Sequence, residues 1–136
     1  DYKGRSVSIS GDTIYDENLI NNSQNVDVLF HESMSLDLVN LINRNAERTG
    51  NRMAAKVTID IQDYHTPIPD IVRAAQKANV GHLVFYHHLP APRNQLMENI
   101  MYRGVDEIME NWTASHDGTM LVLPIDSDEI IITSVE

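Results

Sequence analysis

Short apolar runs alternate along the chain with segments of helical periodicity, and this alternation constrains the fold more than any other feature. Runs of strand length occupy residues 5–12, 26–31 and 82–87. Apolar residues recur at helical spacing over residues 16–22, 36–46, 67–78 and 96–109. Two closing strands are predicted at residues 118–123 and 129–135. This order is typical of a layered α/β fold, and residues 1–136 show no repeat or linker, so one structural unit is predicted.

The segment 51–64 leaves two interpretations open. Val57 and Ile59 alternate with polar residues as in a strand, but acidic residues interrupt the pattern. The helix that follows is better defined, because Thr66 is a suitable N-cap and Pro67 suits the first helical position.

The chain is acidic, with a net charge of −10 from 10 lysines and arginines against 20 aspartates and glutamates. Proteins that bind nucleic acid use basic patches to replace the counterions of the phosphates. The only local concentration of basic residues is Arg44, Arg48, Arg52 and Lys56, and acids lie among their neighbours. Nucleic acid is therefore not expected as a partner of this segment.

Membrane and disulfide signals are both missing from the sequence. No apolar run approaches the ~20 residues that cross a bilayer, so no membrane span is predicted. The chain has no cysteine, which excludes a disulfide framework and a thiolate metal site. We expect a soluble protein, with the cytoplasm and the periplasm both open as compartments.

Side chains that bind metals or carry protons stand at the predicted strand ends or just before a helix: Asp12, His31, Glu32, His65, His87 and His88. Taken singly, each is more typical of a turn, a helix cap or a buried structural histidine. The carboxyl ends of strands in α/β folds, however, are where ligands collect. Histidine and carboxylate are also the standard ligands of zinc and related metals.

The order of these motifs carries more information than any one of them. Five motifs succeed one another: Gly11-Asp12-Thr13, His31-Glu32-Ser33, His65-Thr66-Pro67, the run 83–87 ending in His87, and Asp117-Gly118. This succession resembles the metallo-β-lactamase superfamily, and most closely the branch of ribonuclease Z, the arylsulfatase-like enzymes and the lactonases. The resemblance implies the C-terminal half of an αββα sandwich.

The resemblance also implies a role for four residues. Asp12 would be the carboxylate that bridges two metal ions, and His87 would be a terminal ligand of one of them. His65 would be the general acid that protonates the leaving group, with Glu32 as the carboxylate that orients it. The implied cofactor is a pair of zinc ions, with manganese and iron as alternatives, which share and acidify a water molecule.

The sequence departs from the family pattern near the last of these ligands. Tyr86 stands where the family has a small residue, and His88 directly follows His87, so either histidine could be the ligand; the register favours His87. The proline-containing loop 88–93 differs from the shorter loop of ribonuclease Z, which argues against ribonuclease activity.

The family motif His-x-His-x-Asp-His is absent from the chain, since no two of its six histidines have that spacing. In the family this motif lies in the N-terminal half, so Asp1 is expected to fall in the middle of the fold. We therefore predict weak metal binding and no useful turnover for the chain alone. The open apolar face of such a half is expected to pair with the N-terminal half or with a second copy of the chain.

Three functions follow from these observations. The leading one is a metal-dependent hydrolase of small or sulfated esters, in which a metal-activated water attacks a phosphorus, sulfur or acyl centre. The second is a phosphodiesterase like ribonuclease Z. The third is a non-catalytic α/β interaction module with structural histidines. A nucleotide-binding domain ranks lower, because the sequence has no glycine-rich phosphate loop.

Overall fold

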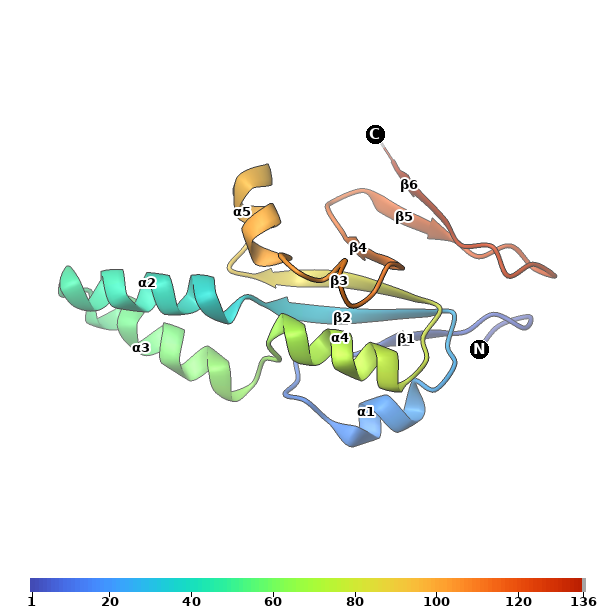
Figure 1. Ribbon diagram of the computed structural model, residues 1–136, viewed down its shortest axis with the longest axis horizontal. Coiled ribbons are helices and arrows are strands. Elements are labelled where there is room, and N and C mark those ends of the chain that lie inside the picture. The colour runs from blue at the N-terminus through green and yellow to red at the C-terminus, as the bar shows by residue number, and fades with distance from the viewer. Residues whose placement is uncertain (136) are drawn as a thin grey trace.

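A parallel sheet of four strands, in the order β1-β2-β3-β4, forms the centre of the molecule (Figure 1). The computed structural model describes residues 1–135. The strands of this sheet are β1 (Val7–Ile9), β2 (Val28–Met34), β3 (His82–Leu89) and β4 (Trp112–Ala114). A separate antiparallel pair is formed by β5 (Thr119–Val122) and β6 (Ile131–Ser134).

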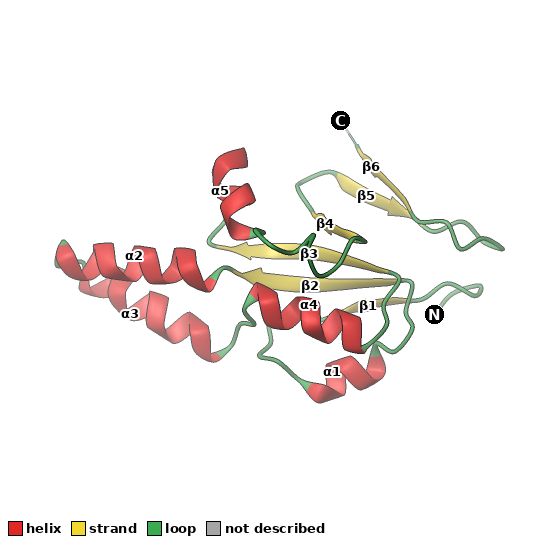
Figure 2. Ribbon diagram, in the orientation of Figure 1, coloured by secondary structure: helices red, strands yellow, loops and turns green. Residues whose placement is uncertain are grey.

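Helices connect the strands (Figure 2). They are α1 (Glu17–Asn22), α2 (Leu36–Arg48), α3 (Arg52–Asp60), the 3-10 helix η1 (Ile61–Asp63), α4 (Ile68–Lys77) and α5 (Gln95–Met101). Parallel neighbours need such crossover connections, which a tight hairpin cannot supply. Helix α4, with α1 beside it, covers one face of the sheet. Within residues 1–135, no helix has both the length and the apolar character to cross a membrane.

The hydrophobic core lies between the sheet and helix α4. Leu29, Leu83 and Phe85 point from the central strands into a cluster with Ile71 and Val72 of α4, and all five side chains are fully buried. Burying a side chain of this size stabilises the fold by about 1.5–3 kcal/mol. The core therefore holds α4, and the segment that precedes it, against the carboxyl ends of the strands.

The opposite side of the sheet is most exposed along its β1 edge, and Phe30 next to that edge is half-buried. Val7 and Ile9 of β1 are exposed, although Val28 and Val84 on the same side of the central strands are fully buried. The expected open apolar face is thus concentrated on the edge strand.

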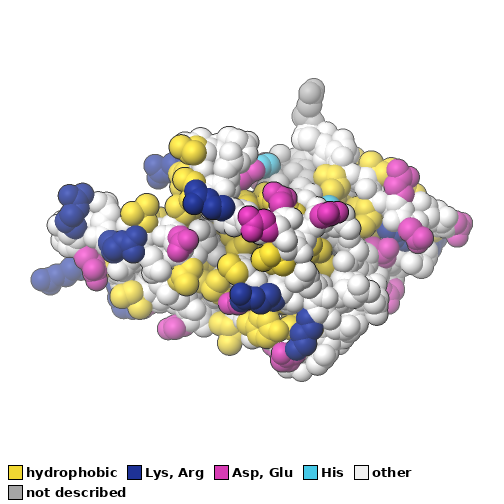
Figure 3. Space-filling model, in the orientation of Figure 1, with side chains coloured by type: hydrophobic (Ala, Val, Ile, Leu, Met, Phe, Trp, Pro, Cys, Tyr) yellow, Lys and Arg dark blue, Asp and Glu magenta, His cyan; other side chains and the backbone are white. Residues whose placement is uncertain are grey.

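Helices α2 and α3 form a hairpin that extends past the carboxyl ends of β2 and β3 (Figure 1). The side-chain amide of Asn43 donates to the Ala55 carbonyl and to the Thr58 hydroxyl, and these bonds join the two helices. Lys and Arg side chains gather over this hairpin at the left of Figure 3. The four basic residues singled out in the sequence all belong to this hairpin and are all exposed: Arg44, Arg48, Arg52 and Lys56.

Two local expectations differ from the structure, and one open question is resolved. Segment 51–64, which the sequence left ambiguous, is mainly helical, because Asn51 caps α3 and Thr58 is buried against α2. The predicted helix 96–109 ends at Met101, and turns then lead to the unpredicted strand β4. Pro67, not Thr66, occupies the N-cap of α4.

A buried histidine gives the fold a specific dependence on pH. His31 is almost fully buried, its Nδ1 donates to the Glu32 carbonyl at 2.8 Å, and burial lowers its pKa to about 4. Because the unfolded chain binds this proton near pH 6.5, His31 stabilises the fold above that pH and loses this contribution as the pH falls toward 4.

We predict that the stability advantage of the wild type over His31→Asn shrinks by roughly 3 kcal/mol between pH 6.5 and pH 4. Asparagine keeps a donor near the position of Nδ1 but does not titrate. Urea unfolding at a series of pH values measures the difference. The exposed His116→Asn variant is the control, and a constant difference between wild type and His31→Asn would contradict the prediction.

Candidate metal centre

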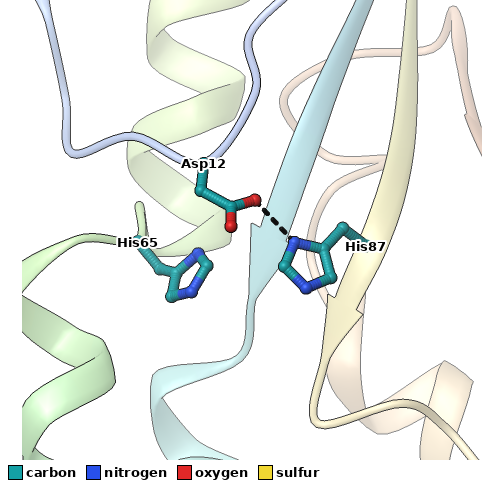
Figure 4. A group of neighbouring side chains, drawn as sticks. All are labelled: Asp12, His65 and His87. Carbon is teal, nitrogen blue, oxygen red and sulfur yellow. Dashed lines mark hydrogen bonds and ion pairs between the residues drawn. The ribbon is translucent and has the colours of Figure 1, made fainter.

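Asp12, His65 and His87 converge at the carboxyl ends of the parallel strands, although they are far apart in the sequence. Asp12 follows β1, His65 precedes α4 and His87 lies in β3. Figure 4 shows the Asp12 carboxylate between the two imidazole rings. Each residue offers one ligand atom, and these three atoms lie within 4.8 Å of one another. The closest pair is Asp12 Oδ1 and His87 Nδ1, which are 2.7 Å apart.

An irregularity in β3 sets the direction of His87. The pairing of β2 with β3 runs in register to Glu32 and Tyr86, and then resumes with Ser33 opposite His88. His87 is therefore an extra residue in its strand, a β-bulge, and its φ of 44° lies in the left-handed region. This conformation costs a residue other than glycine about 1–3 kcal/mol and persists only where the surroundings enforce it. Bulges next to functional sites commonly redirect a side chain in this way.

His65 is paired with a buried carboxyl group. The Glu32 side chain is fully buried, and its Oε2 lies 3.3 Å from His65 Nδ1. The other carboxylate oxygen accepts from the Thr66 amide at 2.7 Å. Within residues 1–135, neither Glu32 Oε2 nor His65 Nδ1 forms a hydrogen bond of good geometry with any group. Each of these two atoms therefore has the other as its nearest partner.

Burial changes the proton affinity of both members of this pair. Burial raises the pKa of Glu32 to about 7, and the Asp12 charge adds to this effect while the Thr66 and Thr13 amides oppose it. Burial also lowers the pKa of His65; His87 acts in the same direction, and Asp12 opposes it. The imidazole of His65 is therefore mainly neutral at neutral pH in the metal-free protein. A neutral imidazole is the form that binds a metal ion.

The donor set fits a divalent metal ion. A carboxylate and two imidazoles are the oxygen and nitrogen ligands that zinc, manganese and iron accept. The side chains of Asp12 and His87 are 54% and 43% exposed, which leaves an open side on the group. Three protein donors with an open position are typical of catalytic zinc sites. His65 was predicted as a general acid, and its position accommodates either a ligand or an acid.

His88, the other histidine considered as a ligand, points away from this group. Its Nδ1 lies 2.5 Å from the Tyr102 hydroxyl and 3.0 Å from the Ser33 hydroxyl. Its Nε2 lies 2.7 Å from the Ser115 carbonyl oxygen. Both ring nitrogens of His88 are thus engaged within the protein, whereas His87 faces Asp12.

A contact of Thr66 that was not predicted from the sequence fixes the loop of Asp12. The Thr66 hydroxyl donates to the Thr13 carbonyl at 2.6 Å, while the Thr66 amide holds Glu32. Thr66 therefore links the Asp12 loop, the segment of His65 and the buried carboxylate. The only signal in the sequence was the position of each threonine directly after a candidate residue.

Comparison with known proteins bears on the identity of this fold. No protein-family model matches the chain. Ribonuclease Z of Mycobacterium tuberculosis (strain ATCC 25618 / H37Rv) is 31% identical over 88 residues, 65% of this chain and 28% of that protein. Among solved structures, the metallo-β-lactamase fold protein YhfI from Bacillus subtilis matches 82% of this chain and 36% of its own, with 18% identity and a TM-score of 0.51. The chain shares the metallo-β-lactamase fold.

A second relative extends the match to most of the chain. Ribonuclease Z of Halalkalibacterium halodurans is 27% identical over 124 residues, 90% of this chain and 34% of that protein. The predicted α/β class and the resemblance to the metallo-β-lactamase superfamily are therefore confirmed. The chain spans about a third of the length of the relatives that it matches.

We predict that Asp12→Asn and His87→Ala each weaken zinc binding by more than about tenfold, the loss that even outer residues of metal sites can cause. Each variant removes one of only three donors in the group. Titration calorimetry of the 136-residue chain with zinc measures the effect. The exposed residues Asp128 and His116 provide matched controls, Asp128→Asn and His116→Ala. Equal zinc affinity in all four variants would place the metal elsewhere.

Proposed function

We propose that the chain forms part of a metal-dependent hydrolase that cleaves an ester. The observation that carries this proposal is the convergence of Asp12, His65 and His87 on one point, with the buried Glu32 behind His65. The metallo-β-lactamase fold and the relatives named ribonuclease Z support a hydrolase of this kind.

In this proposal Asp12 and His87 would hold the metal, Asp12 through its carboxylate and His87 through its imidazole. When bound, the metal pair supplies Lewis acidity and lowers the pKa of water, so that a nucleophile is available at neutral pH. Zinc is the proposed ion, with manganese and iron as alternatives, because the donors are oxygen and nitrogen. The side chains of Asp12 and His87 are partly exposed to solvent, which leaves room for the substrate.

His65 and Glu32 act on the leaving group. Glu32 Oε2 faces His65 Nδ1 and fixes the orientation of the ring, so Nε2 is the atom that donates a proton to the departing oxygen. The charge of Glu32 stabilises the imidazolium form of His65 before this transfer. After the transfer the imidazole is neutral, the form that burial favours in the metal-free protein.

We propose a small ester of phosphate, sulfate or a carboxylic acid as the substrate, as in the arylsulfatase-like enzymes. The net charge of −10 opposes a polyanionic substrate unless another segment provides basic surface. The alternative is a phosphodiesterase that acts on RNA, which the names of the relatives favour. A non-catalytic interaction module is the third candidate, and it predicts that no chemistry depends on Asp12.

The three donors of this chain do not include the His-x-His-x-Asp-His motif of the superfamily. We propose that a further segment or a second copy of the chain supplies the remaining ligands. The exposed apolar side chains of Val7 and Ile9 on β1 are the proposed contact surface for that partner.

The role of His65 can be tested in the assembled, active protein by a change of leaving group. His65→Asn should lose about 10²–10⁴-fold in kcat/KM toward esters of an aliphatic alcohol. It should lose far less toward p-nitrophenyl esters, because p-nitrophenolate departs without a proton. Steady-state kinetics with both substrate types, together with the zinc content of each variant, measures the difference.

Glu32→Gln should show the same selectivity as His65→Asn but a smaller loss, because glutamine keeps an acceptor for the Thr66 amide. The exposed variant His116→Asn is the control. An equal loss toward both substrate types, accompanied by loss of zinc, would make His65 a metal ligand instead. Full activity in Asp12→Ala would overturn the proposed function.

A further inference from the structure

A second polar cluster, partly buried, lies beside the candidate metal centre and contributes no ligand to it. It consists of Ser33 in β2, His88 in β3, Tyr102 after α5 and Ser115 after β4. Ser33 and Tyr102 are buried, and their hydroxyl oxygens lie 3.0 Å apart. His88 and Ser115 are half-buried. Burying polar groups side by side costs free energy unless each is hydrogen-bonded. The contacts of the cluster therefore indicate what it does for the fold.

Hydrogen bonding fixes the orientation of the His88 ring. A carbonyl oxygen can only accept, so His88 Nε2 donates to Ser115 across 2.7 Å. In the neutral ring Nδ1 is then the acceptor, and it receives the hydrogen of the Tyr102 hydroxyl at 2.5 Å. Burial raises the pKa of Tyr102, which keeps that hydrogen in place.

The same residues support the backbone on the N-terminal side of the bulge. The Ser33 hydroxyl donates to the Tyr86 carbonyl at 3.3 Å. The Ser115 amide and hydroxyl both donate to the Phe85 carbonyl, at 2.9 and 2.8 Å. The carbonyls of Phe85 and Tyr86, which precede His87, thus accept hydrogen bonds from Ser115 and Ser33. The His88 ring, which follows His87, is held by Tyr102 and Ser115.

The direction of His88 determines the direction of His87. In a regular strand residue 87 would share the inner face with Phe85, since side chains alternate. The one-residue shift places His88 there instead, opposite Ser33 and against the Tyr102 ring. His87 becomes the extra residue, with its φ of 44° and its side chain directed at Asp12.

We infer that His88 is a positioning residue, whose hydrogen bonds with Tyr102 and Ser115 hold the bulge that directs His87 to the metal. Only the link between His87 and a metal ion rests on the proposed function. The bulge itself is a property of the chain without any ion.

His88→Phe tests the inference, because the phenyl ring fills a similar volume and makes none of the hydrogen bonds. Tyr102→Phe is the milder second variant, and it keeps the packing of this ring against Phe85 and Trp112. Thr58→Val is the matched control. It also removes one buried hydroxyl, in α3 far from the bulge.

Two measurements are made on each chain. The backbone ¹³C chemical shifts of His87, recorded without metal, report whether the residue is left-handed. Titration calorimetry with zinc alone reports the affinity. We expect His88→Phe and Tyr102→Phe to lose the left-handed shifts and to bind zinc at least about tenfold more weakly. Thr58→Val should keep the wild-type shifts and affinity.

If His87 keeps the ¹³C chemical shifts of a left-handed backbone in both folded variants, the inference is overturned, whatever the zinc affinity. Wild-type zinc affinity in variants whose His87 shifts have changed would also overturn it, because the bulge would then not serve the metal. If wild-type zinc binding does not depend on Asp12 or His87, the proposed function fails. Loss of the left-handed shifts would in that case still support His88 as the residue that holds the bulge.

Discussion

The parallel pairing of β2 with β3 is the constraint on which the rest of the structure depends. These two strands place Glu32 and His87 within one residue of each other in register, at the carboxyl end of the sheet. Because the register of this pairing shifts by one residue, the adjacent side chains of His87 and His88 point in different directions. His88 packs against Tyr102 on the core side of the sheet, and His87 turns out toward Asp12.

The buried pair of Glu32 and His65 is the second element that the site requires. Taking a carboxylate out of water is costly, and the raised pKa of Glu32 expresses that cost. Backbone hydrogen bonds from Thr66 and Thr13, together with the contact with His65, offset it in part. A protein that kept this arrangement only for stability would do as well with apolar residues, which favours a role for the pair in chemistry.

Much of this architecture could be predicted from the sequence, because it is written in local patterns. The apolar runs that become β2 and β3, the helical periodicity of α2 and α4, and the polar residues at the strand ends are all local signals. The bulge was not predictable, because it depends on contacts of His88 with residues 14 and 27 positions away. Segment 51–64 was ambiguous for a similar reason, since its helix is stabilised by contacts of Asn43 with Ala55 and Thr58.

The most direct test of the account is anomalous diffraction at the zinc absorption edge, from crystals of the chain soaked in zinc. We predict that the strongest peak lies within bonding distance of both the Asp12 carboxylate and the His87 ring, with His88 still hydrogen-bonded to Tyr102 and Ser115. A strongest peak at His88, at His116 or on the acidic surface, with none between Asp12 and His87, would contradict it.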